Sequence, residues 1–270
     1  MTDKDESKPT ITKQPWWKFL LVITGILVWV WAAIVAAQFV IGYLMLFILG
    51  PDKFIQPIWS AIYSALSYLI AMILIIWLPY GVITARKNDK HKMSKRSKRR
   101  DLVTMDRHGL GLNSFPTWTD IGLAPVGYIV YIILASILMA IFANFSWFNA
   151  SQAQDVGFDY FISGFDRVVA FLTLVVIAPI AEEIIFRGWL YGILRNKTAS
   201  RYKEWVSILV SILIVSILFG IVHGQWNVGV NVFALSIVLC GLREITGTIY
   251  AGILLHMLKN GIAFYLLYMM

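Results

Sequence analysis

Residues 19–49 read FLLVITGILVWVWAAIVAAQFVIGYLMLFIL, without a single charged side chain. A helix needs about 20 apolar residues to cross the hydrocarbon core of a bilayer. The stretch is too long for the core of a signal peptide, and no small-residue cleavage site follows a short core within it. We therefore predict a retained membrane helix that is either tilted or followed by an interfacial segment.

Six further apolar runs follow along the chain, and most have the length of a membrane helix. Val228–Leu242 is short for a full crossing, so a partial or re-entrant helix is the alternative there. The runs are continuous rather than alternating, which argues against a membrane β-barrel. The predicted fold class is an all-α, polytopic transmembrane bundle of seven spans, with six or eight as alternatives. The six runs are Ile58–Ile83, Pro125–Phe148, Val168–Leu194, Trp205–His223, Val228–Leu242 and Thr248–Met270.

The composition excludes other protein classes. Apolar residues make up 59% of the 270 residues and charged residues only 14%, against about 25% charged in an ordinary soluble domain. Disordered chains contain fewer apolar residues than this chain does. A soluble globular protein could not cover so much apolar surface with so few charged residues. The single cysteine excludes a disulfide scaffold and a cysteine-based zinc cluster.

The charges predict the orientation of the spans. Arg86–Arg100 holds nine Lys or Arg and one acid, whereas Asn149–Asp166 holds three aspartates, Asp155, Asp159 and Asp166, and no Lys or Arg. Basic loops stay in the cytoplasm. We therefore predict a cytoplasmic N-terminus and, with seven spans, an external C-terminus. A second basic loop carries Arg195, Lys197, Arg201 and Lys203.

The basic run also bears on partners and domains. A nucleic-acid or anionic-lipid site is one interpretation, but a topological anchor accounts for the run, so we expect the lipid bilayer and no nucleic acid as partner. We predict a polar cytoplasmic tail at 1–15 and one helical membrane domain at 16–270. That domain includes a basic cytoplasmic loop at 84–124 and, at about 165–270, a core that carries the candidate site residues described below. The oligomeric state is left open.

Several polar side chains interrupt the later spans. An ionised residue at mid-membrane costs about 2.5–3.5 kcal/mol on insertion scales. Glu183 and Arg187 are spaced i, i+4 and can form an ion pair, whereas Glu182 points about 100° away from Glu183. Phe219 with His223, and His256 with Asn260, share the i, i+4 spacing. Three helices thus each present a polar face, and we expect these faces to meet.

The clustered residue types suit hydrolysis. A carboxylate such as Glu182 can act as a general base, and His and Asn side chains can assist it and donate hydrogen bonds to an oxyanion. Alternatively, Glu182, His223 and His256 are the ligand types of a catalytic zinc ion, although their spacing is not His-Glu-x-x-His. A structural role in helix packing, or a proton or ion pathway, is the competing interpretation. Lys259 either faces a water-filled cavity or pairs with a carboxylate.

The three motifs resemble those of the CAAX-protease and bacteriocin-processing (CPBP, or Abi) family of intramembrane proteases. The motifs are Glu182-Glu183-x-x-x-Arg187, Phe219-x-x-x-His223 and His256-x-x-x-Asn260, in this order on successive apolar runs. The resemblance implies that Glu182 activates water with help from His223, and that His256 and Asn260 hold the oxyanion. Glu183, Arg187 and Phe219 match supporting positions.

The resemblance also implies a function. It predicts a multi-pass intramembrane endopeptidase of a bacterial cell membrane that cleaves a membrane-associated peptide or lipidated protein, in CAAX-type processing or in bacteriocin self-immunity. No cofactor is certain, and zinc held by Glu182, His223 and His256 is the alternative to a metal-free glutamate mechanism. A non-catalytic immunity or scaffold protein is the alternative function, followed by a transporter.

Overall fold

The computed structural model describes residues 15–79, 109–152 and 163–270, and every regular element among them is a helix. Seven of these segments are long and apolar enough to cross a membrane, which confirms the predicted fold class. The N-terminal tail, the basic run Arg86–Arg100, Asp155 and Asp159 lie outside the described residues. The helices are α1 (Trp16–Leu49), α2 (Pro51–Phe54), α3 (Pro57–Met72), η1 (Ile73–Trp77), α6 (Trp118–Phe142), α7 (Gly164–Phe171), η3 (Leu172–Ile177), α8 (Ala178–Glu182), η4 (Glu183–Leu190), α9 (Tyr191–Ala199), α10 (Glu204–Ile221), α11 (Trp226–Thr246) and α12 (Tyr250–Tyr268).

The helix α1 lies at the periphery of the bundle. Its 34 residues would measure about 51 Å at a rise of ~1.5 Å per residue, which exceeds the roughly 30 Å of hydrocarbon core. Only 17% of its most apolar window is buried, against 50% for the span Gly164–Ala199. The short helix α2 follows directly, so both predicted accommodations of the length, tilt and a following short segment, remain consistent with the structure.

Two capping boxes begin helices earlier than the apolar runs predicted. The Thr117 side chain accepts from the Asp120 amide while the Asp120 carboxylate accepts from the Thr117 amide, so α6 begins at Trp118 and Pro125 lies inside it. Ser163 and Asp166 make the same motif at the start of α7. Each box satisfies backbone N–H groups that the first turn leaves free. The predicted start at Pro125 was therefore wrong, and Asp166 belongs to a helix rather than to the acidic loop.

The sixth span is a full-length helix. The helix α11 covers 21 residues, so the prediction of a short span was wrong. The last turn carries Arg243 and Glu244, whose charges made the apolar run end early. The Glu244 carboxylate accepts from Arg195 Nε and from the Tyr191 hydroxyl, each at 2.7 Å, which compensates its charge within the bundle.

The fourth span is one continuous helix with two π-helical segments, η3 and η4. The Ala178 amide bonds the Thr173 carbonyl five residues back. In this register the Leu174 carbonyl would need a donor at position 179, which is a proline without an N–H. Asn260 of α12 supplies the donor instead, with Nδ2 at 2.9 Å from the Leu174 oxygen.

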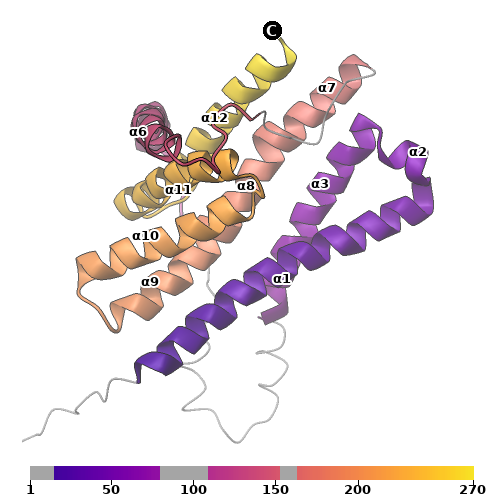
Figure 1. Cartoon of the computed structure of the whole chain (residues 1–270). Coiled ribbons are helices and arrows are strands. Elements are labelled where there is room, and N and C mark those ends of the chain that lie inside the picture. The colour runs from indigo at the N-terminus through magenta and orange to yellow at the C-terminus, as the bar shows by residue number, and fades with distance from the viewer. Residues whose placement is uncertain (1–14, 80–108, 153–162) are drawn as a thin grey trace, which may run out of the picture.

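The helices form two groups on either side of the fourth span. Figure 1 shows α1 and α3 on one side of the long helix α7–α9, and α6, α11 and α12 on the other. The helix α10 packs against α11 at a glycine crossing, where a Cβ on Gly220 would lie 2.9 Å from the Gly229 carbonyl oxygen. The fourth span and α11 are the most buried of the seven candidate spans, at 50% each, and the carboxylates of the fourth span lie among the surrounding helices.

One contact relates two parts of the chain to the same membrane face. The Phe19 ring near the start of α1 packs edge-on against Tyr202 in the α9–α10 turn, with centroids 5.9 Å apart, and Arg201 lies over the same Phe19 ring. The start of α1 and the basic α9–α10 turn therefore share one face, as the charge-based orientation requires.

Candidate active site

Glu182 and Glu183 stand at the junction of α8 and η4 and point to different surroundings. Glu183 is fully buried (0% exposed), whereas Glu182 keeps 8% of its surface exposed and lines a cavity. This divergence is what adjacent helix positions predict. Wide π turns are frequent at functional sites, and these two carboxylates lie between η3 and the body of η4.

Glu183 holds a buried network together. Its Oε1 accepts from Arg187 Nη1 at 3.0 Å, the ion pair that the i, i+4 spacing predicted, and from His256 Nδ1 at 3.1 Å. The Arg187 guanidinium lies 4.2 Å from the centroid of the Phe219 ring. Gly252 allows this close approach, because a Cβ there would lie 2.9 Å from Glu183 Oε2. The network thereby connects the motifs of the fourth, fifth and seventh spans.

His256 lies between the two carboxylates. A carboxylate can only accept, so His256 Nδ1 carries the proton that it donates to Glu183. The opposite nitrogen, Nε2, is 3.7 Å from Glu182 Oε2, which is too long for a direct hydrogen bond. In the neutral imidazole, a nitrogen lone pair therefore faces a carboxylate oxygen across a small gap.

His223 lies in the connection between α10 and α11. Its Nδ1 donates to the Phe219 carbonyl at 2.7 Å, which leaves the Nε2 lone pair free. Burial lowers the pKa of His223, because desolvation outweighs the attraction of the nearby Glu182 charge. The Phe219 ring packs against both imidazoles, with centroids 4.9 Å from His223 and 6.0 Å from His256.

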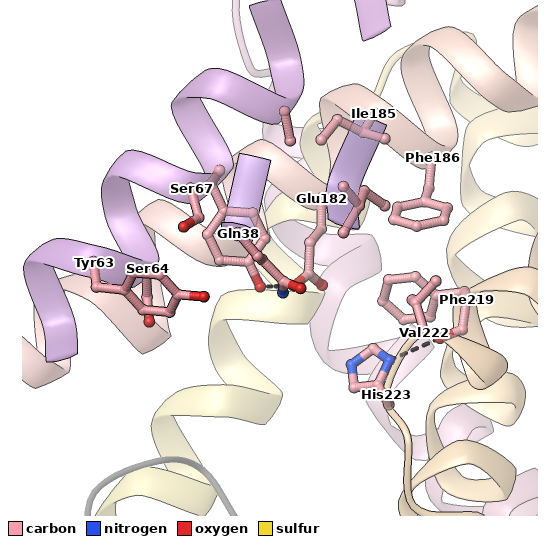
Figure 2. A pocket seen from close by; sticks show the side chains of 13 residues that line it. Gln38, Tyr63, Ser64, Ser67, Glu182, Ile185, Phe186, Phe219, Val222 and His223 are labelled. Atoms are coloured by element: carbon pink, nitrogen blue, oxygen red, sulfur yellow. Dashed lines mark hydrogen bonds between the residues drawn. The ribbon is translucent and has the colours of Figure 1, made fainter. Parts of the chain in front are cut away.

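A cavity of about 180 Å³ brings Glu182 and His223 together. Figure 2 shows both side chains facing this space, with Phe219 next to His223. A water molecule takes up about 30 Å³ in the liquid, so the cavity is large enough for several waters or a short piece of peptide. His256 does not line the cavity, although its Nε2 is 3.7 Å from Glu182 Oε2.

The opposite wall of the cavity comes from α1 and α3, which the sequence analysis did not connect with the site. Its polar residues are Gln38, Tyr63, Ser64, Ser67 and Tyr68. Two signals could have indicated them. Gln38 is the only amide side chain in residues 19–49, and Ser60, Ser64 and Ser67 recur at helical spacing beside Tyr68. Their partners lie more than 100 residues away along the chain, so spacing alone could not reveal the contact.

Two further residues of α12 have different surroundings. Asn260 Nδ2 donates to the Leu174 carbonyl, as described above. Lys259 has no hydrogen bond or ion pair within the described part of the chain, but its charge acts on both Glu182 and His223. Lys259 therefore lies near Glu182 and His223 without a direct partner among the described residues.

The zinc alternative does not fit the residues as they are placed. Within residues 15–79, 109–152 and 163–270, no three His, Cys, Asp or Glu side chains gather in an arrangement that could hold a metal ion. Catalytic zinc needs three protein ligands at about 2.0–2.2 Å from one point.

The C-terminal part of the chain is similar to one known protein family. Residues 164–262 match the family model described as type II CAAX prenyl endopeptidase Rce1-like. The match covers more than a third of the chain, includes all three motifs, and confirms the resemblance to the CPBP family. No curated protein and no solved structure matches the chain.

Proposed function

With residues 164–262 identified as an Rce1-like segment of the type II CAAX prenyl endopeptidase family, we propose that the protein is a metal-free intramembrane endopeptidase with Glu182 as its general base. The observation that carries the proposal is the position of the Glu182 carboxylate, at the wall of a cavity that His223 also lines and with His256 Nε2 at 3.7 Å. A general base must lie within reach of the water that it activates.

The gap between Glu182 and His256 suits that water. Glu182 Oε2 and His256 Nε2 are 3.7 Å apart, and both are acceptors when the carboxylate is ionised and the imidazole neutral. A water about 2.8 Å from each would meet them at an angle of about 83°, which allows it to donate to both. Two acceptors on one water increase the nucleophilicity of its oxygen.

The reaction balances without a further reactant. The water oxygen attacks the scissile carbonyl carbon, and Glu182 takes one water proton. When the carbon–nitrogen bond breaks, the leaving nitrogen takes the proton back from Glu182, which leaves a carboxylic acid and an amine as products. His223 Nε2 accepts a hydrogen bond from the substrate at the other side of the cavity, because its lone pair is free.

The oxyanion would be held by Asn260 of α12. The neutral His256 cannot donate to it, because its only proton, on Nδ1, is used by Glu183. Asn260 keeps a second N–H besides the one that it gives to Leu174. Three residues act as positioning residues because they hold the two histidines from outside the gap between Glu182 and His256. Glu183, paired with Arg187, holds His256. Phe219 accepts from His223 through its carbonyl and packs its ring against both imidazoles.

The substrate class follows from the family and the membrane setting. We propose CAAX-type processing of a lipidated, membrane-associated protein or peptide, in a bacterial cell membrane and with the N-terminus of the enzyme in the cytoplasm. The single helical membrane domain at 16–270 would be the catalytic unit, because α1 and α3 form one wall of the cavity.

Replacing the proposed base tests the function. In proteoliposomes, we expect the wild type to cleave a farnesylated peptide that ends in a CAAX sequence, and Glu182→Gln to lose at least about 100-fold in rate. The matched control is Glu204→Gln, whose side chain is 72% exposed on α10, with a rate within about twofold of wild type. Cleavage by a correctly folded Glu182→Gln variant would refute the mechanism. No cleavage by the wild type, of this peptide or of its unprenylated form, would refute the CAAX assignment.

A further inference from the structure

Tyr68 of α3 makes the one direct hydrogen bond to the Glu182 carboxylate within the described residues. Its hydroxyl is 2.5 Å from Glu182 Oε1. An ionised carboxylate offers no proton, so the tyrosine is the donor. The contact joins residues 114 positions apart in sequence and reaches the site from outside the segment that matches the protease family.

This bond makes the two Glu182 oxygens different. Oε1 is occupied by Tyr68, and Oε2 faces His256 Nε2 at 3.7 Å. A carboxylate on a flexible three-bond side chain would otherwise rotate between equivalent positions. With Oε1 fixed, the lone pairs of Oε2 point toward the gap in which the reacting water is expected.

The packing of α3 supports the contact. Ser67 is buried beside Tyr68, and Ala61 and Ala71 are buried on the same helix. Ala61 packs in an apolar cluster with Ala170 and Val175 of the fourth span, and α3 also contacts α8. Tyr68 therefore reaches Glu182 from a helix that packs against the fourth span. Both residues also line the cavity, which lies beside the hydrogen bond.

We propose that Tyr68 is a positioning residue, which holds Glu182 Oε1 and so presents Oε2 as the base in the hydrolysis. The inference rests on the proposed function, since it concerns the same carboxylate. It also implies that the N-terminal half of the chain completes the active site rather than only anchoring it.

The test compares Tyr68→Phe with Tyr131→Phe. Tyr131 is the matched control, because its hydroxyl also donates a short hydrogen bond to a side chain of another helix, at 2.6 Å from Asn231 Oδ1. For the farnesylated CAAX peptide, we expect Tyr68→Phe to lower kcat about tenfold to hundredfold, the effect of losing a hydrogen bond to a charged group, with KM within about twofold. Tyr131→Phe should leave both values within about twofold of wild type.

Infrared spectroscopy gives a readout that does not depend on turnover. The carboxylate stretch of Glu182, assigned by its loss in Glu182→Gln, should move to higher frequency in Tyr68→Phe and stay unchanged in Tyr131→Phe. If Tyr68→Phe does not fold, 3,5-difluorotyrosine at position 68 keeps the shape and strengthens the donor, so the band should move to lower frequency.

The outcomes separate the two proposals. An unchanged kcat in Tyr68→Phe, or a band that moves in neither variant of position 68, overturns the positioning role while the hydrolysis stands. A wild type that cleaves no peptide overturns the hydrolysis, and the infrared band then decides whether Tyr68 binds the carboxylate at all.

Discussion

At the scale of single residues, the buried ion pair of Glu183 and Arg187 stabilises the site. Both side chains are 0% exposed, and Glu183 Oε2 and two Arg187 nitrogens have no hydrogen-bond partner in the part of the chain that the structure describes. A buried charge that loses its partner costs about 3–5 kcal/mol, whereas replacing both charges by apolar groups is often neutral.

We therefore expect Arg187→Met to reduce stability by about 3 kcal/mol or more, because Glu183 would keep only the His256 donor. Thermal unfolding of the detergent-solubilised protein would show a lower Tm. Adding Glu183→Leu to Arg187→Met should recover part of the loss. An Arg187→Met variant as stable as wild type would show that the pair contributes no net stabilisation.

The residue scale also shows what the sequence could predict about the site. The i, i+4 spacing predicted the Glu183–Arg187 pair, and the polar faces of three spans do meet around His256. Tyr68 could not be predicted, because its hydrogen bond to Glu182 depends on how α3 packs against α8. The roles of Glu182, His223, His256 and Asn260 in catalysis stay predictions.

At the scale of helices, the crossing of α10 and α11 fixes the position of His223. Cβ atoms on Gly220 and Gly229 would lie 2.9 and 3.0 Å from the facing carbonyl oxygens. His223 follows Gly220 by three residues, so any separation of the two backbones moves its imidazole relative to Glu182.

We expect Gly220→Ala or Gly229→Ala to push the helices apart and lower the cleavage rate about tenfold or more, since misplacements near 1 Å can cost about a hundredfold. Gly241→Ala on α11 is the matched control, because a Cβ there meets nothing within 4 Å, and it should stay near wild type. Equal rates in all three variants, measured with the farnesylated peptide, would contradict a positioning role for the crossing.

The helix scale also shows where hydropathy falls short. Apolar runs predicted seven spans correctly, but they missed the starts of α6 and α7, which capping boxes set. They also predicted too short a helix at α11. The charged Arg243 and Glu244 end the apolar run, although both are hydrogen-bonded within the bundle and belong to the helix. The π segments of the fourth span have no hydropathy signal at all.

At the scale of the whole molecule, the packing places two parts of the chain that are predicted to be cytoplasmic beside each other. The α9–α10 turn is basic and lies on the same face as the start of α1. Ser151, which follows α6, is separated from that turn by the span Gly164–Ala199.

Thiol labelling with a membrane-impermeant maleimide tests this orientation. Cys240 is fully buried, so the wild type serves as an unlabelled reference. We expect Ser151→Cys to react in intact cells and Ser200→Cys only after permeabilisation, because both positions are exposed but face opposite compartments. The reverse pattern would invert the topology, and equal labelling would contradict the crossing between them.

The π segments on both sides of Glu182 have a consequence for how the gene can change. A π turn contains one residue more than the α-helix needs over the same rise, and losing one residue rotates the rest of a helix by about 100°. A single-codon deletion within Leu172–Ile177 would leave the span just as apolar and just as able to insert. If the π turn persisted, the deletion would turn Glu182 away from His256. If the π turn became an α turn, the Leu174 carbonyl would gain a backbone partner and the contact with Asn260 would be lost. Apolar residues of the fourth span can thus be exchanged for one another, but the number of residues between the capping box at Ser163 and the two carboxylates cannot change.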